Sequence, residues 1–212
     1  MIIVLNPVAQ GEPAPSPAAF RMVPATIGFV LGLWIALAIV GLLLLYFVFA
    51  FNALVRHRNR VDNAWAGIDV QLRRRYDLIP NLVKAVQGYA SHERELFEGV
   101  TEARSRGIAA GTVAEQAEAE TALTRALGRL MAVAENYPQL RASENFLALQ
   151  EELTATESKI AFARQFYNDQ VMKLNTMIEQ FPSLIVARLG GFSEREFFEA
   201  EDDSRGAVAV DV

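Results

Sequence analysis

One short run in the chain begins like a metalloprotease helix motif. In the motif His-Glu-x-x-His, two histidines four residues apart bind zinc and the glutamate acts as a general base. Here His92-Glu93-Arg94-Glu95 is followed by Leu96, so the second zinc ligand is missing, and His57 is the only other histidine. An imidazole-rich metal site is therefore excluded, and a surface charge cluster is the favoured interpretation of this run.

The rest of the sequence offers no other set of residues for catalysis. It contains no cysteine, which excludes thiolate metal sites and cysteine nucleophiles. It also lacks a glycine-rich phosphate loop, a workable Ser/His/Asp set and the Glu-x-x-His spacing of di-iron bundles. We therefore expect a protein that is not an enzyme, with no catalytic residue, no cofactor, no metal and no small-molecule substrate.

Three consecutive arginines, Arg73, Arg74 and Arg75, could bind phosphate or anionic lipid. Asp69 precedes Arg73 by four residues, which favours an ion pair within one helix. On a rigid helix the triplet would lie roughly 30 Å beyond the preceding apolar segment, several Debye lengths from a bilayer. Pairing within the chain is the favoured interpretation, and lipid binding is the alternative. We expect Arg75, which shares a face with apolar residues, to pair with an acid such as Glu157 or to extend its charge to solvent.

Polar residues also recur every seven positions beside an apolar seam in the C-terminal half. One column contains Gln150, Glu157 and Arg164, and a second contains Asn168 and Asn175. A buried asparagine can fix the register of packed helices, and a solvent-facing asparagine fits the pattern equally well. Together with the three arginines, these five residues are the candidate interaction residues.

A long uncharged segment precedes all of these residues. Residues 22–55 carry no formal charge, and Ile27–Phe51 is more than the about 20 apolar residues that a helix needs to cross a bilayer. The segment is longer than a signal peptide core and no basic cluster precedes it, so a cleaved signal fits poorly. Arg56, Arg58 and Arg60 follow at once, which predicts a single-pass protein with its N-terminus outside and its C-terminal domain cytoplasmic.

Small residues line one face of the predicted span. Gly28, Gly32 and Ala36 are spaced at four residues, which allows two helix backbones to approach closely. We treat these three residues as a candidate packing face within the membrane, with a chance occurrence of small residues as the equal alternative.

Composition divides the chain into four parts. Residues 1–24 hold five of the eight prolines and predict a disordered, Ala/Pro-rich extension. Residues 25–55 form the transmembrane helix and 56–192 a helical bundle domain. Residues 193–212 form an acidic tail that accounts for the net charge of −5. The tail is expected to be disordered, with docking of Phe192, Phe197 and Phe198 onto the bundle as the alternative. The remainder is balanced in charge, so no basic surface points to nucleic acid.

The periodicity after the span is helical throughout. Apolar residues from Val61 to Val100 recur at steps of four and three, which predicts one long helix, kinked at Pro80 and ending near Gly107–Gly111. Thr112 and Glu115 have the spacing of a capping box and start a second helix, which ends near Asn136.

A third long helix is predicted by a seven-residue apolar repeat. The repeat contains Phe146, Leu153, Ile160, Tyr167, Leu174 and Phe181. The middle helix is too short to cover the other two. Either Pro80 divides the first helix, which gives four bundle helices, or an apolar face is left for self-association or a partner. The fold class is therefore all-α: one N-terminal transmembrane helix and an antiparallel bundle of three to four long helices.

A series of short motifs runs along the chain from Phe51 to Phe198. They include Phe51-Asn-Ala-Leu-Val-Arg-His-Arg-Asn-Arg60, Gln71-Leu-Arg-Arg-Arg-Tyr-Asp-Leu-Ile-Pro-Asn81, Gly88-Tyr-Ala-Ser-His-Glu93, Glu135-Asn-Tyr-Pro138 and Ile178-Glu-Gln-Phe-Pro182. With these motifs in this order, the sequence resembles the LemA family. The resemblance implies a bacterial single-span inner-membrane protein with a cytoplasmic antiparallel helical bundle. The family includes a magnetosome-associated branch, its genes often lie beside those of membrane metalloproteases or other envelope proteins, and no enzymatic activity is established for it.

Three functional hypotheses follow. The favoured one is a non-enzymatic, membrane-anchored scaffold or interaction module, which self-associates or binds an envelope or membrane-protease protein. The alternative is a lipid-organising protein that uses the Arg73–Arg75 cluster. An enzyme of unknown activity is the least favoured. The expected partners are the lipid bilayer and a second copy or another inner-membrane protein.

Overall fold

The computed structural model describes residues 23–199, and it confirms the all-α fold class. Within these residues every regular element is a helix and no strand occurs. The helices are α1 (Val23–Gln87), α2 (Arg94–Ala109), α3 (Val113–Ala134), α4 (Pro138–Arg141), α5 (Glu144–Glu179) and α6 (Ser183–Leu189). The proline-rich extension and the end of the acidic tail lie outside the described residues.

The chain forms two compact units, of which the first ends at Phe49. Its described part is the apolar beginning of α1, whose large side chains, such as Phe29 and Trp34, are exposed. By length and composition this is the one helix in the described chain that is able to cross a membrane. A Cβ built on Gly28 or Gly32 would meet no other atom within 4 Å, so this face is open. Its packing role stays a prediction.

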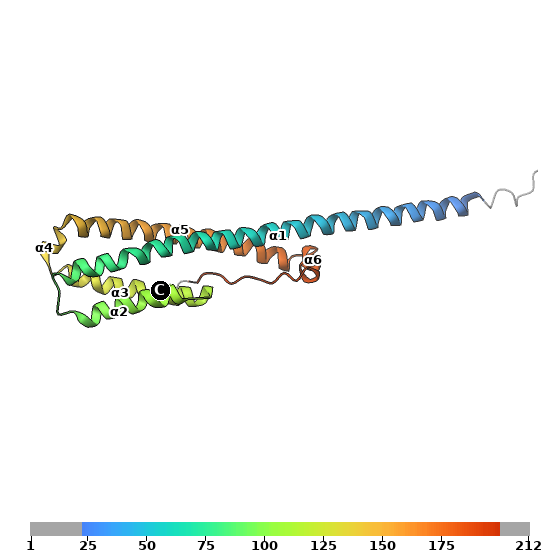
Figure 1. Ribbon diagram of the computed structural model, residues 1–212. Coiled ribbons are helices and arrows are strands. Elements are labelled where there is room, and N and C mark those ends of the chain that lie inside the picture. Colours follow the sequence, from blue (N-terminus) through green and yellow to red (C-terminus); the bar gives the residue numbers. More distant parts are fainter. Residues whose placement is uncertain (1–22, 200–212) are drawn as a thin grey trace, which may run out of the picture. The chain divides into compact units, whose positions relative to one another are not determined.

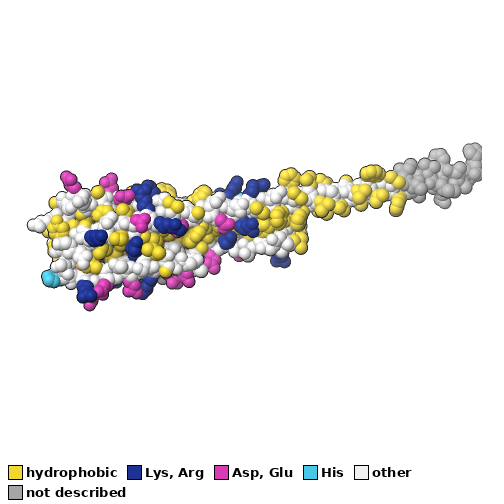
Figure 2. All heavy atoms as spheres, in the orientation of Figure 1, with side chains coloured by type: hydrophobic (Ala, Val, Ile, Leu, Met, Phe, Trp, Pro, Cys, Tyr) yellow, Lys and Arg dark blue, Asp and Glu magenta, His cyan; other side chains and the backbone are white. Residues whose placement is uncertain are grey.

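The second unit begins at Ala50 and contains a four-helix bundle. The later part of α1, then α2, α3 and α5 run alternately up and down its length (Figure 1). Helix α4 lies at the turn between α3 and α5, and α6 packs against α5 at the other end. The surface of the bundle mixes acidic and basic side chains (Figure 2).

The helix break lies elsewhere than the sequence predicts. Helix α1 passes through Pro80 and ends at Gln87, and the chain turns at residues 88–93 before α2 begins at Arg94. The prediction of a single helix as far as Gly107 is therefore wrong. The sequence shows no interruption at this point, because the buried residues of α2, such as Phe97 and Val100, continue the three- and four-residue spacing of the apolar residues in α1. Gly88, a weak helix former, is the first residue after α1.

Helix α1 tolerates Pro80 because another helix supplies the missing donor. A proline inside a helix cannot donate to the carbonyl four residues earlier, which here belongs to Tyr76. Arg104 of α2 donates its Nε–H to this carbonyl at 2.8 Å. A contact between two helices thus replaces a hydrogen bond within one helix, and it ties α2 to α1.

The other two predicted helices are confirmed. Thr112 caps α3, its hydroxyl accepting from the Glu115 amide while the Glu115 carboxylate accepts from the Thr112 amide. The backbone amides of Gly111 and Thr112 lower the pKa of Glu115. In α5 the seven-residue repeat is buried as far as Leu174. Phe181, the last residue of the repeat, lies after the end of α5 and is 75% exposed, so the repeat extends beyond the helix and the core.

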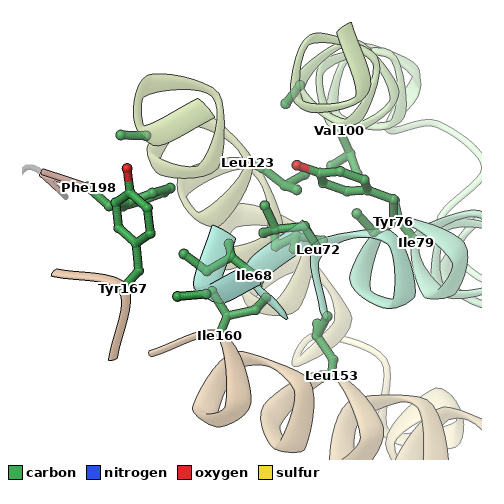
Figure 3. Packing of buried hydrophobic residues seen from close by; sticks show 14 of the residues in the cluster. Ile68, Leu72, Tyr76, Ile79, Val100, Leu123, Leu153, Ile160, Tyr167 and Phe198 are labelled. Atoms are coloured by element: carbon green, nitrogen blue, oxygen red, sulfur yellow. The ribbon is translucent and has the colours of Figure 1, made fainter. Parts of the chain in front are cut away.

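The core runs the length of the bundle. Ile68, Leu72, Tyr76 and Ile79 of α1 meet Val100 of α2, Leu123 of α3 and Leu153, Ile160 and Tyr167 of α5 (Figure 3). Each such side chain contributes about 1.5–3 kcal/mol when fully buried. Phe198 also belongs to this cluster, although it comes from the segment that follows α6. The segment after α6 is therefore part of the fold.

The Arg104 contact gives a first testable prediction. Replacing Arg104 by Met keeps the aliphatic stem but leaves the Tyr76 carbonyl without its donor, which should lower the unfolding free energy by about 1–3 kcal/mol. Replacing Pro80 by Ala restores a backbone donor in α1, so the Arg104→Met loss should shrink in a Pro80→Ala background. Chemical denaturation of the four chains in detergent measures this cycle. Equal losses in both backgrounds would contradict the assignment.

Candidate functional site

A buried ionic cluster lies between α1, α3 and α5. The Arg75 guanidinium of α1 donates through Nη1 to Oε2 of Glu120 of α3 at 2.9 Å, and their side chains are 3% and 1% exposed. The Nη2 of Arg75 donates to the Thr124 hydroxyl at 3.0 Å. Arg164 of α5 brings a second guanidinium to 3.8 Å from Oε2 of Glu120. One carboxylate is thus shared by two arginines.

Tyr76 hydrogen-bonds to the second oxygen of the Glu120 carboxylate. Its hydroxyl donates to Oε1 of the carboxylate and accepts from Nε2 of Gln116 at 2.8 Å. Burial raises the pKa of the Tyr76 phenol, and the Glu120 carboxylate raises it further. A Cβ built on Gly107 of α2 would lie 2.5 Å from the Tyr76 hydroxyl, so only glycine lets α2 approach this closely. All four bundle helices therefore meet at this layer.

The cluster is suited to holding helices together. Burial is also the main cause that lowers the pKa of Arg164, and Glu120 opposes it. Arg75 and Glu120 pair directly, although the buried Nε of Arg75 and of Arg164 has no hydrogen-bond partner. Removing one partner of such a buried charge pair is strongly destabilising, because the other charge is then left uncompensated. No group of three His, Cys, Asp or Glu side chains able to hold a metal occurs in the described residues.

Each arginine of the predicted triplet has a partner within the chain. Arg73 pairs with Asp69 at 2.7 Å, as its spacing predicts. Arg74 pairs with Glu152 of α5 at 2.5 Å, on the surface. Arg75 turns inward to Glu120, and the expected partner Glu157 lies at 4.0 Å and is itself exposed. The structure thus separates the three arginines instead of presenting them as one patch.

The two predicted asparagines hold the segment after α6. We call residues 193–199 of this segment the strap, and they run back from α6 along the bundle (Figure 1). The Asn175 amide accepts from the Arg195 backbone N–H and donates to its carbonyl, both at 2.9 Å. The Asn168 amide likewise accepts from Phe198 N–H at 2.8 Å and donates to its carbonyl at 3.2 Å. Residues 193–199 were predicted to begin a disordered tail, and here they are packed on α5.

Aromatic and charged side chains hold the strap between the two asparagines and beyond. Tyr167 donates its hydroxyl to the Glu196 carbonyl at 2.9 Å. The Phe198 ring is 3% exposed, and it lies 6.2 Å from the Trp65 ring and 4.6 Å from the Arg164 guanidinium. The Tyr167 ring lies 5.5 Å from the same Trp65 ring, and Figure 3 shows Tyr167 and Phe198 in the same part of the core. The strap therefore occupies a groove made by α1 and α5.

The remaining candidates do not join these two groups. Gln150 is exposed near the other end of α5, and His92 and Glu93 are exposed in the turn before α2. Of the column Gln150, Glu157 and Arg164, only Arg164 contacts both the ionic cluster and the strap.

The central acid, Glu120, and its two neighbours, Gln116 and Tyr76, were not among the residues predicted from the sequence. Glu120 and Gln116 lie three and seven residues before Leu123, so they continue the inner face of α3 towards its start. Polar residues at positions on the inner face of α3 were the feature of the sequence that indicated a buried polar cluster. For the strap, its phenylalanines were the one feature of the sequence that indicated packing against the bundle.

Fold and site together define an all-helical protein with one candidate membrane-spanning helix and a four-helix bundle centred on a buried ionic cluster. A model described as the LemA family matches residues 64–212. The chain belongs to the LemA family.

The relatives are bacterial proteins of low identity. Magnetosome protein MamQ 2 of Paramagnetospirillum magneticum is 26% identical over 175 residues, covering 70% of this chain and 64% of its own length. Magnetosome protein MamQ of Magnetospirillum gryphiswaldense is 25% identical with the same coverage. Protein LemA of Metamycoplasma hominis is 25% identical over 168 residues, covering 78% of this chain and 76% of its own. The chain thus spans less than two thirds of the MamQ relatives, and none of these names states a reaction.

The ionic cluster gives a second prediction. Replacing Glu120 by Ala leaves Arg75 buried without its carboxylate, which should lower the unfolding free energy by about 3–5 kcal/mol. The control is Glu98→Ala, which breaks the exposed Arg94–Glu98 pair and should cost less than about 0.5 kcal/mol. Chemical denaturation measures both chains. Similar losses in the two variants would contradict a structural role for Glu120.

Tyr76 predicts a dependence of stability on pH. Because its pKa is raised from the ordinary value of 10.0 in the folded chain, its contribution is complete below that pH and is lost as the pH rises above it. The burial of Tyr167 raises the pKa of that phenol too and adds to the effect. Unfolding free energies measured from about pH 9 to about pH 11 should fall less steeply in a Tyr76→Phe chain. Identical slopes would show that Tyr76 titrates alike in both states.

Proposed function

We propose that this protein is a non-enzymatic scaffold anchored in the bacterial inner membrane by a single span, with its N-terminus outside and its bundle in the cytoplasm. Magnetosome proteins among its bacterial relatives support an association with membranes. The exposed Arg56, Arg58 and Arg60 directly after the apolar part of α1 support this orientation.

The observation that carries the proposal is an apolar surface on the outer side of α5. Phe162 and Phe166 lie one helical turn apart and are 73% and 56% exposed. Leu147 of the same helix is also exposed. Adjacent exposed aromatic side chains mark sites of protein association, since their burial contributes more than that of scattered apolar residues. This surface is where we place a second copy or another inner-membrane protein.

The internal chemistry of the bundle agrees with a scaffold. Its most deeply buried ionisable side chains, Arg75 and Glu120, are used to hold helices together. A rigid bundle presents its outer face in a constant geometry, which an interaction module requires.

The alternative, a lipid-organising protein that uses Arg73–Arg75, is supported less well. Each of these guanidiniums has an acidic partner within the chain, at 2.7, 2.5 and 2.9 Å. Binding a lipid phosphate would require breaking those pairs. An Arg73→Ala chain should therefore bind anionic vesicles as the parent chain does.

A fourth prediction tests the scaffold surface. The full chain with Phe162→Asp and Phe166→Asp should lose a photo-crosslinked complex that forms in the native membrane from a probe placed at Leu147. It should also show a lower mass by light scattering in detergent if the partner is a second copy. Ile108→Asp is the matched control, because it charges an exposed apolar position on α2.

An unchanged crosslinking pattern and mass in the double variant would refute association through this surface. Loss of both in Ile108→Asp as well would attribute the effect to added charge alone.

A further inference from the structure

The strap and its groove have the form of a peptide and its binding site. Residues 195 and 198 of the strap each exchange two backbone hydrogen bonds with one asparagine amide, at 2.8–3.2 Å. Each asparagine amide donates to the carbonyl of one strap residue and accepts from the N–H of the same residue. These are the two backbone hydrogen bonds that a residue makes with a neighbouring β-strand. The two asparagines therefore recognise extended backbone without regard to side chains.

The spacing of the asparagines matches an extended chain. Seven residues of α5 between Asn168 and Asn175 advance about 10.5 Å. Three extended residues from Arg195 to Phe198 span about 10 Å. Because Asn175 holds Arg195 and Asn168 holds Phe198, the strap runs antiparallel to α5. A helical or turned segment would not meet both amides.

Two side-chain contacts add sequence preference. Phe198 is buried against Trp65 and beneath the Arg164 guanidinium. Arg195 pairs with Asp62 of α1 at 3.0 Å. The two residues between them, Glu196 and Phe197, line a pocket beside α3, and Phe197 is 43% exposed. The groove therefore selects an extended peptide of the form Arg-x-x-Phe.

Six hydrogen bonds and the buried Phe198 ring hold the strap, while the rest of its surface stays in contact with water. Of its seven residues only Phe198 is buried, and the Arg195–Asp62 pair is about half exposed on both sides. A surface pocket opens between the strap and α3, lined by Ala117, Thr121 and Phe197 among others. The strap leaves α6 through Gly190 and Gly191, and Gly191 adopts a φ of 67° that favours glycine. These two glycines place a turn outside the helices between α6 and the strap.

We propose that the groove also binds the strap of a second copy, so that two anchored chains exchange their Arg195–Phe198 segments. The inference rests on the proposed scaffold function and names one of its contacts. A second copy carries the identical peptide, and the exchanged segment would make the same contacts as the original one. Anchoring of both copies in one membrane raises their effective concentration and favours exchange over release.

The experiment uses the absence of cysteine from the natural sequence. Two full-length chains with different tags are co-expressed, one with Asp62→Cys and the other with Arg195→Cys. Membranes are treated with a short bifunctional thiol crosslinker, which bridges the positions that the ion pair joins. Exchange predicts a heterodimer linked between 62 and 195. The matched control pairs Asp62→Cys with Arg94→Cys, an exposed position on α2, and should give no heterodimer above background.

Two further variants separate binding from misfolding. Asn168→Ala with Asn175→Ala removes the four hydrogen bonds from α5 to the strap backbone, and Phe198→Ser removes the strap ring that packs in the core. Each should lower the yield of heterodimer about tenfold or more, while the helical circular dichroism of the chain is kept. The cysteine pair placed in one chain should report the intrachain arrangement in the same membranes.

A yield of heterodimer no greater than the Arg94→Cys control, with efficient intrachain crosslinking, overturns the exchange. If the mass in detergent is then still that of an oligomer, the scaffold function stands and only strap exchange is wrong. If the strap captures a different protein at position 195 and no second copy, the groove is a peptide site for another partner and the proposal is likewise overturned.

Discussion

The bundle depends on one buried carboxylate. Glu120 is almost fully removed from water, and a carboxylate in that position is tolerated only when cations and donors surround it. Arg75 and Tyr76 from α1 and Arg164 from α5 provide them. Because hydrogen bonds tolerate little displacement, α3 cannot slide along its neighbours without losing them. Apolar layers above and below would accept several registers, so the polar layer selects one of them.

The same layer links the core to the surface groove. Arg164 lies 3.8 Å from the Glu120 carboxylate and 4.6 Å from the centre of the Phe198 ring. Its guanidinium is oriented by the buried acid and offers its face to the strap. A free arginine at a helix surface would have to lose rotamer freedom on binding a phenyl ring. Here that freedom is already restricted by Glu120, so the core prepares the groove for its peptide.

The sequence predicted the helices better than it predicted the turn between α1 and α2 or the polar side chains that pair with one another in the bundle. Helix α3 and the repeat of α5 followed from local capping and periodicity, which depend on residues close in sequence. The break after Gln87 did not, because the inner face of α2 happens to continue the phase of α1. The pairing of Arg75 with Glu120 spans 45 residues, and periodicity alone does not choose between partners at that distance. Asn168 and Asn175 were recognised by spacing, while their strap lacked any periodic signal.

The two binding surfaces that we propose on helix α5 are independent in direction. Phe166 and Asn168 are two residues apart, so at about 100° per residue they point to nearly opposite sides of the helix. One surface is apolar and suits a partner with a complementary apolar face. The other surface, which contains Asn168 and Asn175, hydrogen-bonds to extended backbone and binds the strap, a segment that every copy carries. Because neither surface covers the other, a chain could use both at once. Two different contacts on one rigid helix allow an anchored protein to form rows of copies, whereas a single self-complementary contact would stop at a dimer.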